Sequence, residues 1–332
     1  QTPDESASSA LTPAVVYVGT ADGVEAELAG RAGVPFQAIE SGQLRGMAPQ
    51  VALRNLLKMS RGARQASQLI AAFQPDVTFV TGGFVAAPVV WASWRAGVPV
   101  FIYLPDIEPG LAIRRLSRLA RKVAVTCPEA AIHFPGKAVV TGYPLRPEIL
   151  AAAGRPDEAR RQLELALEEP VLLVFGGSRG SRSINQALAA ALPELLLRCQ
   201  VVHISGNLDW PQAQERAQAL PAELRPRYHP FAYLHDSQMA QALAAADLAV
   251  ARAGASTLGE FPALGLPSIL VPYPYSGQHQ DANADYLASR GAALKIADAE
   301  LPARLLPAVV SLLGNPTALH AAAAAARALA RP

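Results

Sequence analysis

The 332-residue sequence has little of several features that mark whole classes of protein. Its two cysteines, Cys127 and Cys199, are too few and too irregularly placed for a disulfide framework or a metal site. The formal net charge is only +2, so no nucleic-acid-binding surface is expected. The sequence contains no run of about 18 apolar residues, so no membrane-spanning helix is expected. The polar N-terminal stretch lacks the pattern of a signal peptide.

What the sequence does contain is typical of a globular α/β protein. Hydrophobic residues make up 51% of the chain and charged residues 17%, and 332 residues favour two domains. Short apolar segments alternate with helical patterns, which predicts parallel, doubly wound sheets. The predicted strands are 14–19, 34–39, 77–81, 98–103, 122–126, 138–141, 171–175, 200–204, 247–251, 268–272 and 293–296.

The domain boundaries are predicted from proline and alanine usage. Arg146 lies between Pro144 and Pro147, a junction that favours a first domain of residues 1–145 and a second of residues 146–315. The alanine-rich tail, residues 316–332, is predicted to be helical.

A glycine turn in the second half has the pattern of a phosphate site. The apolar run 171–175 predicts a buried strand, and Gly176 and Gly177 allow positive φ and a close approach of the backbone. Ser178 adds a hydroxyl donor before a predicted helix, whose first N–H groups and dipole favour an anion. The alternative is a tight strand–helix turn that binds nothing, because such turns are common.

A second segment carries one carboxylate among small residues. The strand at 247–251 is followed by Ala255, Ser256 and Thr257, and Glu260 lies one helical turn further on. Ligands of open α/β sheets bind beyond the carboxyl ends of the strands, where a carboxylate can accept hydrogen bonds from ribose hydroxyls. A helical glutamate is otherwise most often solvated.

A polar cluster follows the next strand. Gln278, His279, Gln280 and Asn283 offer donors and acceptors without fixed charge, which suits the hydroxyls of a sugar. The alternative is a polar surface loop. Together, the three segments predict a site for a nucleotide with a diphosphate and a sugar.

These residues resemble the MurG family of bacterial N-acetylglucosaminyltransferases, in glycosyltransferase family 28. The resemblance rests on GGSRG from Gly176, RAGASTLGE from Arg252 and QDAN from Gln280, and it extends to segments 18–46, 75–103 and 142–150. It implies the GT-B fold, with two Rossmann-like domains of mostly parallel sheet facing each other across a cleft. It also implies that the helix in 316–332 packs back on the first domain.

The resemblance implies roles in binding a UDP-GlcNAc donor. The diphosphate would contact Arg146 and the turn of Gly177 and Ser178, and Glu260 would hold the ribose. The base would lie against the backbone of Ala255 and pack on Tyr233, and Ser256 would also contact the donor. The sugar hydroxyls would contact His279, Gln280 and Asn283, where His279 replaces a glutamine of the family.

The acceptor region departs from the family pattern. The resemblance places this region at Gly82, Gly83, Tyr103 and Asp106. Where the family has His-Glu-Gln-Asn, this chain has Tyr103-Leu104-Pro105-Asp106, so the nature of the acceptor stays open.

The catalytic base is not assigned, because the family's Gly-Gly-His loop has no counterpart among the six histidines of the sequence. We expect the first strand, this loop and most of the first helix of the family fold to be missing from residues 1–332.

The predicted activity is inverting transfer of GlcNAc from UDP-GlcNAc to lipid I, an undecaprenyl-linked acceptor, to form lipid II. No cofactor is expected in the active site, in agreement with the absence of an Asp-x-Asp pair. The alternatives are a GT-B transferase acting on a diacylglycerol or small aglycone, and a nucleotide-sugar-binding protein without activity. An epimerase of the same fold is less favoured, since no cluster of acidic and basic groups for the sugar is evident.

Two basic helical patterns suggest contact with a membrane surface. They cover residues 51–73 and 111–125, where arginine and lysine alternate with apolar residues. The resemblance, through its lipid-linked acceptor, implies a cytoplasmic location, peripheral on the inner face of the cell membrane. The alternative is a pair of ordinary helices with solvated basic faces.

Overall fold

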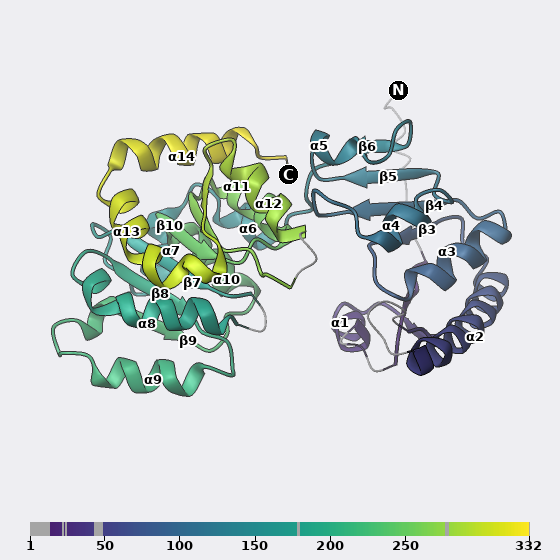
Figure 1. The fold of residues 1–332 in the computed structure, drawn as a ribbon, viewed down its shortest axis with the longest axis horizontal. Helices are drawn as coiled ribbons and strands as arrows, with labels where there is room; N and C mark the ends of the chain where they lie inside the picture. The colour runs from purple at the N-terminus through teal and green to yellow at the C-terminus, as the bar shows by residue number, and fades with distance from the viewer. Residues whose placement is uncertain are drawn as a thin grey trace, which may run out of the picture. The chain divides into compact units, whose positions relative to one another are not determined.

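The structure is a computed structural model that describes residues 14–21, 23, 25–42, 49–177, 180–275 and 279–331. It confirms the predicted α/β class with parallel sheets in two domains (Figure 1). The chain forms two compact units, Gln1–Ile102 with Ala112–Lys122, and Tyr103–Leu111 with Val123–Pro332. The boundaries expected at residues 146 and 316 stay predictions.

Every predicted strand is present, with ends that differ by up to three residues. The strands are β1 (Tyr17–Gly19), β2 (Phe36–Ala38), β3 (Thr78–Val80), β4 (Val100–Leu104), β5 (Lys122–Val125), β6 (Ala138–Val140), β7 (Val171–Phe175), β8 (Gln200–Ile204), β9 (Tyr228–Phe231), β10 (Leu248–Ala251), β11 (Ser268–Leu270) and β12 (Ala293–Lys295).

Strand β9 was not predicted. Its sequence, YHPF, is short and has a histidine and a proline at its centre, so it shows no apolar run. The strand lies at one end of its sheet. Proline is tolerated at such an edge because its missing N–H breaks no ladder on the open side.

Helices connect the strands in both units. They are α1 (Glu25–Arg31), α2 (Pro49–Phe73), α3 (Ala86–Arg95), α4 (Leu111–Leu116), α5 (Pro128–Ala131), α6 (Pro147–Ala152), α7 (Pro156–Gln162), α8 (Arg182–Leu196), α9 (Trp210–Ala219), α10 (Asp236–Ala245), α11 (Glu260–Leu264), α12 (His279–Ala288), α13 (Leu301–Leu313) and α14 (Pro316–Ala328), with 3-10 turns η1 (Arg225–Arg227), η2 (Ala255–Leu258) and η3 (Asp298–Glu300).

The sheet of the second unit determines where a ligand would bind. Its strand order is β12-β11-β10-β7-β8-β9, and every pair is parallel. The chain starts at β7 in the interior, builds outward through β8 and β9, then returns to β10 on the other side of β7. The order therefore reverses between β7 and β10, which is the topological switch point where doubly wound folds bind ligands.

The core of the second unit lies under α8 and α13. Helix α8 places Ile184, Leu188, Leu192 and Leu195 at helical spacing on one face, and all four are buried. They pack in one cluster with alternate residues of β7, β8 and β10 and with residues of α13. This packing fixes the first turn of α8 next to the carboxyl end of β7.

Strands of the first half form two separate parallel arrangements. Strand β1 pairs only with β2 among the described residues, while β3 begins a sheet of order β3-β4-β5-β6. Helices α2 and α3 pack against each other, with Ala66, Ile70 and Ala92 in their common core.

The C-terminal helix α14 packs on α11 and α13. Beyond it, the carbonyl of Arg331 accepts a hydrogen bond from the backbone N–H of Tyr143 at 3.1 Å. A Cβ atom at Gly142 would lie 2.0 Å from the same carbonyl oxygen, so only glycine permits this approach.

Candidate functional site

The glycine turn after β7 is built so that only glycine fits. A Cβ at Gly176 would lie 2.2 Å from the backbone nitrogen of Ser181, and one at Gly180 would lie 2.5 Å from the carbonyl of Ser205. Gly177 has φ of 86°, a left-handed conformation, and its carbonyl accepts a hydrogen bond from the N–H of Gly180. Glycine at these positions lets the turn pack closely on the start of α8 and on the segment after β8. Ser178, predicted to contact the diphosphate, lies outside the described residues.

The N-terminus of α8 follows this turn directly. Ser181 is its N-cap, with extended backbone (φ −149°), and no described side chain caps the first turn. The first N–H groups of a helix have no partner within the helix, and the dipole makes this end positive. The carboxyl end of β7 therefore has the elements of an anion site.

Two predicted donor residues, Arg146 and Glu260, pair with each other in this structure. Nη2 of Arg146 lies 3.1 Å from Oε1 of Glu260, and Nη1 lies 2.9 Å from Oδ1 of Asp236. Glu260 is buried, whereas the side chain of Arg146 is 37% exposed. Burial raises the pKa of Glu260 above its ordinary value, although Arg146 acts in the opposite direction.

The helix start predicted around Glu260 is divided into two pieces. The 3-10 turn η2 begins after Gly254, and α11 begins at Glu260 itself. Gly259 joins them, and a Cβ there would lie 2.4 Å from the Tyr143 side chain. Ala255 and Ser256 lie in η2.

Tyr233 follows β9 and has an exposed side chain. Its ring packs edge-on against His235, with the ring centroids 5.0 Å apart. An exposed aromatic ring beyond the carboxyl end of an edge strand suits stacking on a base.

The predicted sugar contacts on α12 already have partners. Asn283 is fully buried, and its Nδ2 donates to Oδ1 of Asp106 at 2.8 Å and to the carbonyl of Ala253 at 3.0 Å. Its Oδ1 accepts from the N–H of Ile107 at 3.0 Å, so the amide links α12 to two other segments.

Neighbouring side chains of α12 are engaged in part. Nδ1 of His279 lies 3.0 Å from the carbonyl of Glu108. Oε1 of Gln280 accepts from the N–H of Tyr273 at 2.8 Å. Gln278, which the sequence placed in the same cluster, lies outside the described residues.

The residues predicted for the acceptor are divided between the two units. Gly82 and Gly83 follow β3 with positive φ, in the first unit. Tyr103 is buried, and its hydroxyl lies 3.1 Å from Oγ1 of Thr126 and 3.4 Å from the carbonyl of Gly142. Burial raises the pKa of Tyr103, so its phenol stays protonated.

Sequence reasoning assigned no role to Asp236 or Arg252. Asp236 is the first residue of α10 and binds Arg146. Arg252 follows β10 and is largely buried among side chains of several loops. Arg252 is the first residue of the RAGASTLGE motif, and this position could have indicated a role in the site. No motif in the sequence included Asp236.

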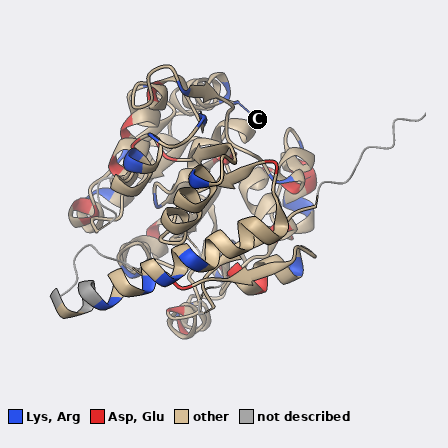
Figure 2. Ribbon diagram, turned by 90° about the vertical axis from the view of Figure 1, so that its right-hand side faces the viewer, with Lys and Arg blue, Asp and Glu red and all other residues tan. Residues whose placement is uncertain are grey.

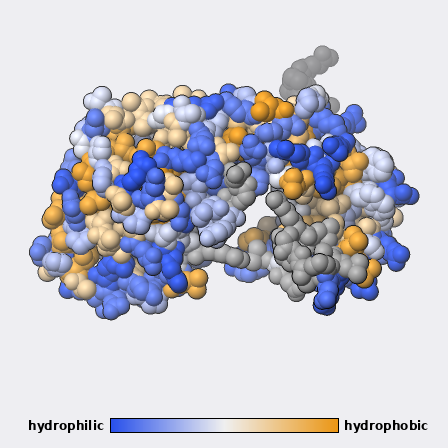
Figure 3. Space-filling view, viewed as in Figure 1, coloured by the Kyte–Doolittle hydropathy of each residue, from blue (hydrophilic) through white to orange (hydrophobic). Residues whose placement is uncertain are grey.

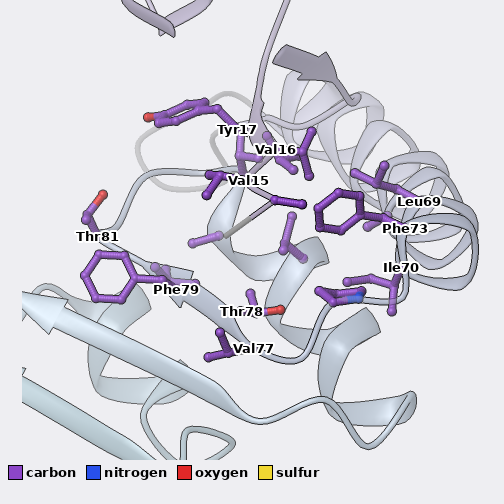
Figure 4. Close-up of a pocket in the computed structure, with 18 of the residues that line it drawn as sticks. Val15, Val16, Tyr17, Leu69, Ile70, Phe73, Val77, Thr78, Phe79 and Thr81 are labelled. Atoms are coloured by element: carbon purple, nitrogen blue, oxygen red, sulfur yellow. The ribbon is translucent and has the colours of Figure 1, made fainter. Parts of the chain in front are cut away.

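A cavity of about 390 Å³ lies within the first unit. Its walls are mostly apolar residues of segments 14–18 and 77–82 and of helices α2 and α3, with Thr78 and Thr81 among them. Figure 4 shows Val15 and Val77 on the two strand segments and Phe73 on α2. We call it the strand-edge cavity, since it is bordered by β1 and β3. Its lining lacks the charged groups that a diphosphate needs, so it is not the donor site.

The described residues contain neither a metal-binding group nor a single membrane-spanning helix. Among the described residues, no group of three or more His, Cys, Asp or Glu side chains is placed to hold a metal ion. In that same part of the chain, no single helix is long and apolar enough to cross a membrane. The segments Asp298–Leu313 and Pro316–Ala328 meet the length and composition only together, with a bend of 95° between them.

Comparison with known protein families decides the assignment. Residues 9–125 match the glycosyltransferase family 28 N-terminal domain, and residues 171–331 match the family 28 C-terminal domain. The chain belongs to glycosyltransferase family 28. The predicted resemblance is therefore confirmed, and the switch-point residues described above lie in or next to the matched C-terminal domain of this family.

Two curated relatives carry the same name. A protein of Roseiflexus sp. (strain RS-1) is 42% identical, over 96% of this chain and 80% of that protein. A protein of Desulforudis audaxviator is 41% identical, over 96% and 86%. Both are named UDP-N-acetylglucosamine--N-acetylmuramyl-(pentapeptide) pyrophosphoryl-undecaprenol N-acetylglucosamine transferase.

Solved structures agree on the fold. The crystal structure of Acinetobacter baumannii MurG is similar with a TM-score of 0.75 and 27% identity, over 96% of this chain and 87% of that one. UDP-GlcNAc 2-epimerase from Neisseria meningitidis is similar with a TM-score of 0.62 and 12% identity, over 93% and 85%. The second likeness, at this low identity, concerns the fold alone.

Proposed function

We propose that this chain is an inverting hexosyltransferase that moves GlcNAc from UDP-GlcNAc to an undecaprenyl-linked N-acetylmuramyl-pentapeptide acceptor. Family membership and the names of relatives above 40% identity support this activity. The structural observation that carries the proposal is the arrangement at the switch point. The glycine turn, the uncapped start of α8 and the buried Glu260 all follow β7 or β10, which are adjacent parallel strands.

The donor would bind by replacing partners that the residues now have. Arg146 contacts Asp236 through Nη1 and Glu260 through Nη2. We propose that the diphosphate takes the place of Asp236, whose side chain is exposed. Glu260 would then accept hydrogen bonds from the ribose, while the ring of Tyr233 stacks on the uracil.

The reaction needs no covalent intermediate. A base removes the proton of the acceptor hydroxyl, whose oxygen bonds to the anomeric carbon as the bond from that carbon to the β-phosphate oxygen breaks. UDP leaves with the bonding electron pair. The backbone N–H groups at the start of α8 and the guanidinium of Arg146 would stabilise the negative charge that develops there. The base stays unassigned.

We propose that this stabilisation operates without a metal cofactor. The proposal rests on the groups present, because a helix N-terminus and an arginine together supply positive potential at the diphosphate. It also rests on the sequence, which has no Asp-x-Asp pair of the kind that holds a metal at a phosphate.

We also propose peripheral binding to the inner face of the cytoplasmic membrane, where a lipid-linked acceptor would be found. Helix α2 has no acidic residue, and its basic residues are interspersed with apolar ones along its length. Figure 2 shows basic positions at intervals along this helix. Leu56 and Leu57 are exposed on α2, as a helix that inserts into a membrane surface requires. Figure 3 shows hydrophobic and hydrophilic residues interspersed over the face that it draws.

A second candidate function is transfer to a different acceptor. It is favoured by the departure at residues 103–106 and by the contacts made there. The hydroxyl of Tyr103 contacts Thr126, and Asp106 accepts a hydrogen bond from Asn283. Both side chains thus have partners within the protein, and neither supplies the free imidazole or carboxylate of the family's histidine and glutamate.

The test is calorimetric binding of UDP-GlcNAc, with UDP-glucose, UDP-galactose and GDP-mannose as controls. The proposal expects selective binding of UDP-GlcNAc, followed by transfer to lipid I in a coupled assay. Preference for another UDP-sugar would refute GlcNAc as the transferred sugar. Transfer only to a diacylglycerol or small aglycone would favour the second candidate. No binding of any nucleotide would refute the donor site.

A further inference from the structure

One guanidinium connects the loops that form the candidate donor site. Arg252 follows β10, and its side chain is 11% exposed. Its Nη2 donates to Oγ of Ser183 at 2.8 Å, and its Nη1 lies 2.5 Å from Oδ1 of Asp298. Nη1 also donates to the carbonyls of Val271 and Pro272, each at 3.2 Å.

Each of these partners belongs to a different part of the fold. Ser183 is in the first turn of α8, three residues after the glycine turn ends at Gly180. The two carbonyls follow β11 directly, and Asp298 opens the 3-10 turn before α13. Ser183 Oγ also donates to Oδ1 of Asp298 at 2.7 Å, so arginine, serine and aspartate form a closed triangle. We call Arg252, Ser183 and Asp298 the arginine triangle.

The connection extends toward the residues predicted to bind the sugar. The guanidinium carbon of Arg252 lies 5.3 Å from the centroid of the Tyr273 ring. The N–H of Tyr273 in turn donates to Oε1 of Gln280 at the start of α12. The position of Gln280 therefore depends on the segment that Arg252 holds.

The charge of Arg252 is already neutralised by Asp298. A largely buried ion pair at 2.5 Å presents little net field to a ligand, and both Nη1 and Nη2 already contact protein acceptors. Arg252 is thus placed to fix geometry rather than to bind phosphate itself.

We propose that Arg252 is a positioning residue for the donor diphosphate, acting through Ser183 and Asp298 on the first turn of α8. This inference rests on the proposed function, because it assumes that the diphosphate binds at that turn. The triangle holds the N–H groups of the turn at a fixed distance from the ends of β10 and β11.

The test compares variants of the triangle in binding uridine, UMP and UDP by calorimetry. The variants are Arg252→Gln, Ser183→Ala and Asp298→Asn. The control is Arg304→Gln, because Arg304 pairs with Glu300 in the same 3-10 turn but is exposed.

The expected pattern is specific to the phosphates. Each triangle variant should bind UDP about tenfold more weakly, because a hydrogen bond to a charged group is lost. Uridine should bind as it does to the wild type, and the control should bind all three ligands normally. If Arg252 instead contacted the diphosphate directly, Asp298→Asn would tighten UDP binding by removing a nearby negative charge, and that result would overturn the inference.

Hydrogen exchange separates a local from a global effect. The triangle variants should speed exchange of the Asn185 amide, whose N–H closes the first turn of α8 on the carbonyl of Ser181 at 2.9 Å, and leave β7 protected. Ser183→Ala removes only one hydroxyl, so it keeps the test decisive if Arg252→Gln fails to fold. Equal loss of uridine and UDP binding in the variants would refute the positioning role. Failure of the wild type to bind UDP would instead refute the proposed function.

Discussion

Replacing Glu260 by alanine is the most direct test of the prediction that this carboxylate binds the ribose. The side chain is buried, and its one hydrogen-bonding partner among the described residues is Arg146, at 3.1 Å. Arg146 keeps a second partner in Asp236, so the substitution does not leave the guanidinium without an acceptor.

The magnitude follows from the bonds that the variant would lose. A carboxylate that accepts hydrogen bonds from two ribose hydroxyls should contribute about 2–3 kcal/mol to UDP binding, or about 30- to 150-fold in Kd. The effect on folding should be smaller, at most about 1 kcal/mol, because Arg146 is more than one third exposed and solvent screens the pair. Affinity should therefore fall far more than stability.

The assay is calorimetric titration with UDP, accompanied by urea unfolding. A matched control is Glu169→Ala, which removes the carboxylate of another partly buried pair, with Arg227 at 2.8 Å in the same unit. That control should bind UDP normally. A folded Glu260→Ala variant with wild-type affinity for UDP would refute the assignment of the ribose to this carboxylate.

Three further predictions concern the same fold. Gly177→Ala should weaken UDP binding and lower thermal stability by about 1–2 kcal/mol, since φ is 86° there; an unchanged variant would contradict the role of the turn. UDP affinity should fall as the pH drops through the raised pKa of Glu260, and Glu260→Gln should remove this dependence. Burial lowers the pKa of His203 to about 4. Between pH 6.5 and pH 4 the imidazole is therefore protonated in the unfolded chain but neutral in the folded one, so the free energy of unfolding should fall by about 3 kcal/mol over this range. In His203→Gln, urea unfolding should show no such loss between pH 6.5 and pH 4; the same loss in this variant would contradict the assignment to His203.

Much of the fold could be predicted from the sequence because buried parallel strands leave a local signal. Segments such as 171–175 and 200–204 are largely apolar and lie between helical patterns, so their existence and class follow from composition. Strand β9 escaped prediction because an edge strand is stabilised by its neighbour, β8, rather than by its own apolar pattern.

The candidate site was predictable in its types of residue but not in its contacts. Glycines that require positive φ and a carboxylate after a strand are visible in the sequence. The sequence did not show that Asn283 binds Asp106, since these residues are 177 positions apart. It also did not show Asp236 beside Arg146, 90 positions away.

The sequence alone determined the α/β class, the strands with apolar cores, the glycine turn and the family, since each depends on residue types at short spacing. The tertiary structure alone decided that β7 and β10 are adjacent, that Arg146 pairs with Glu260, and that Arg252 holds three loops together. The physical reason is that strand order and side-chain pairing depend on contacts between residues far apart in the chain, and local pattern carries no information about which distant partner a strand or a charge will find.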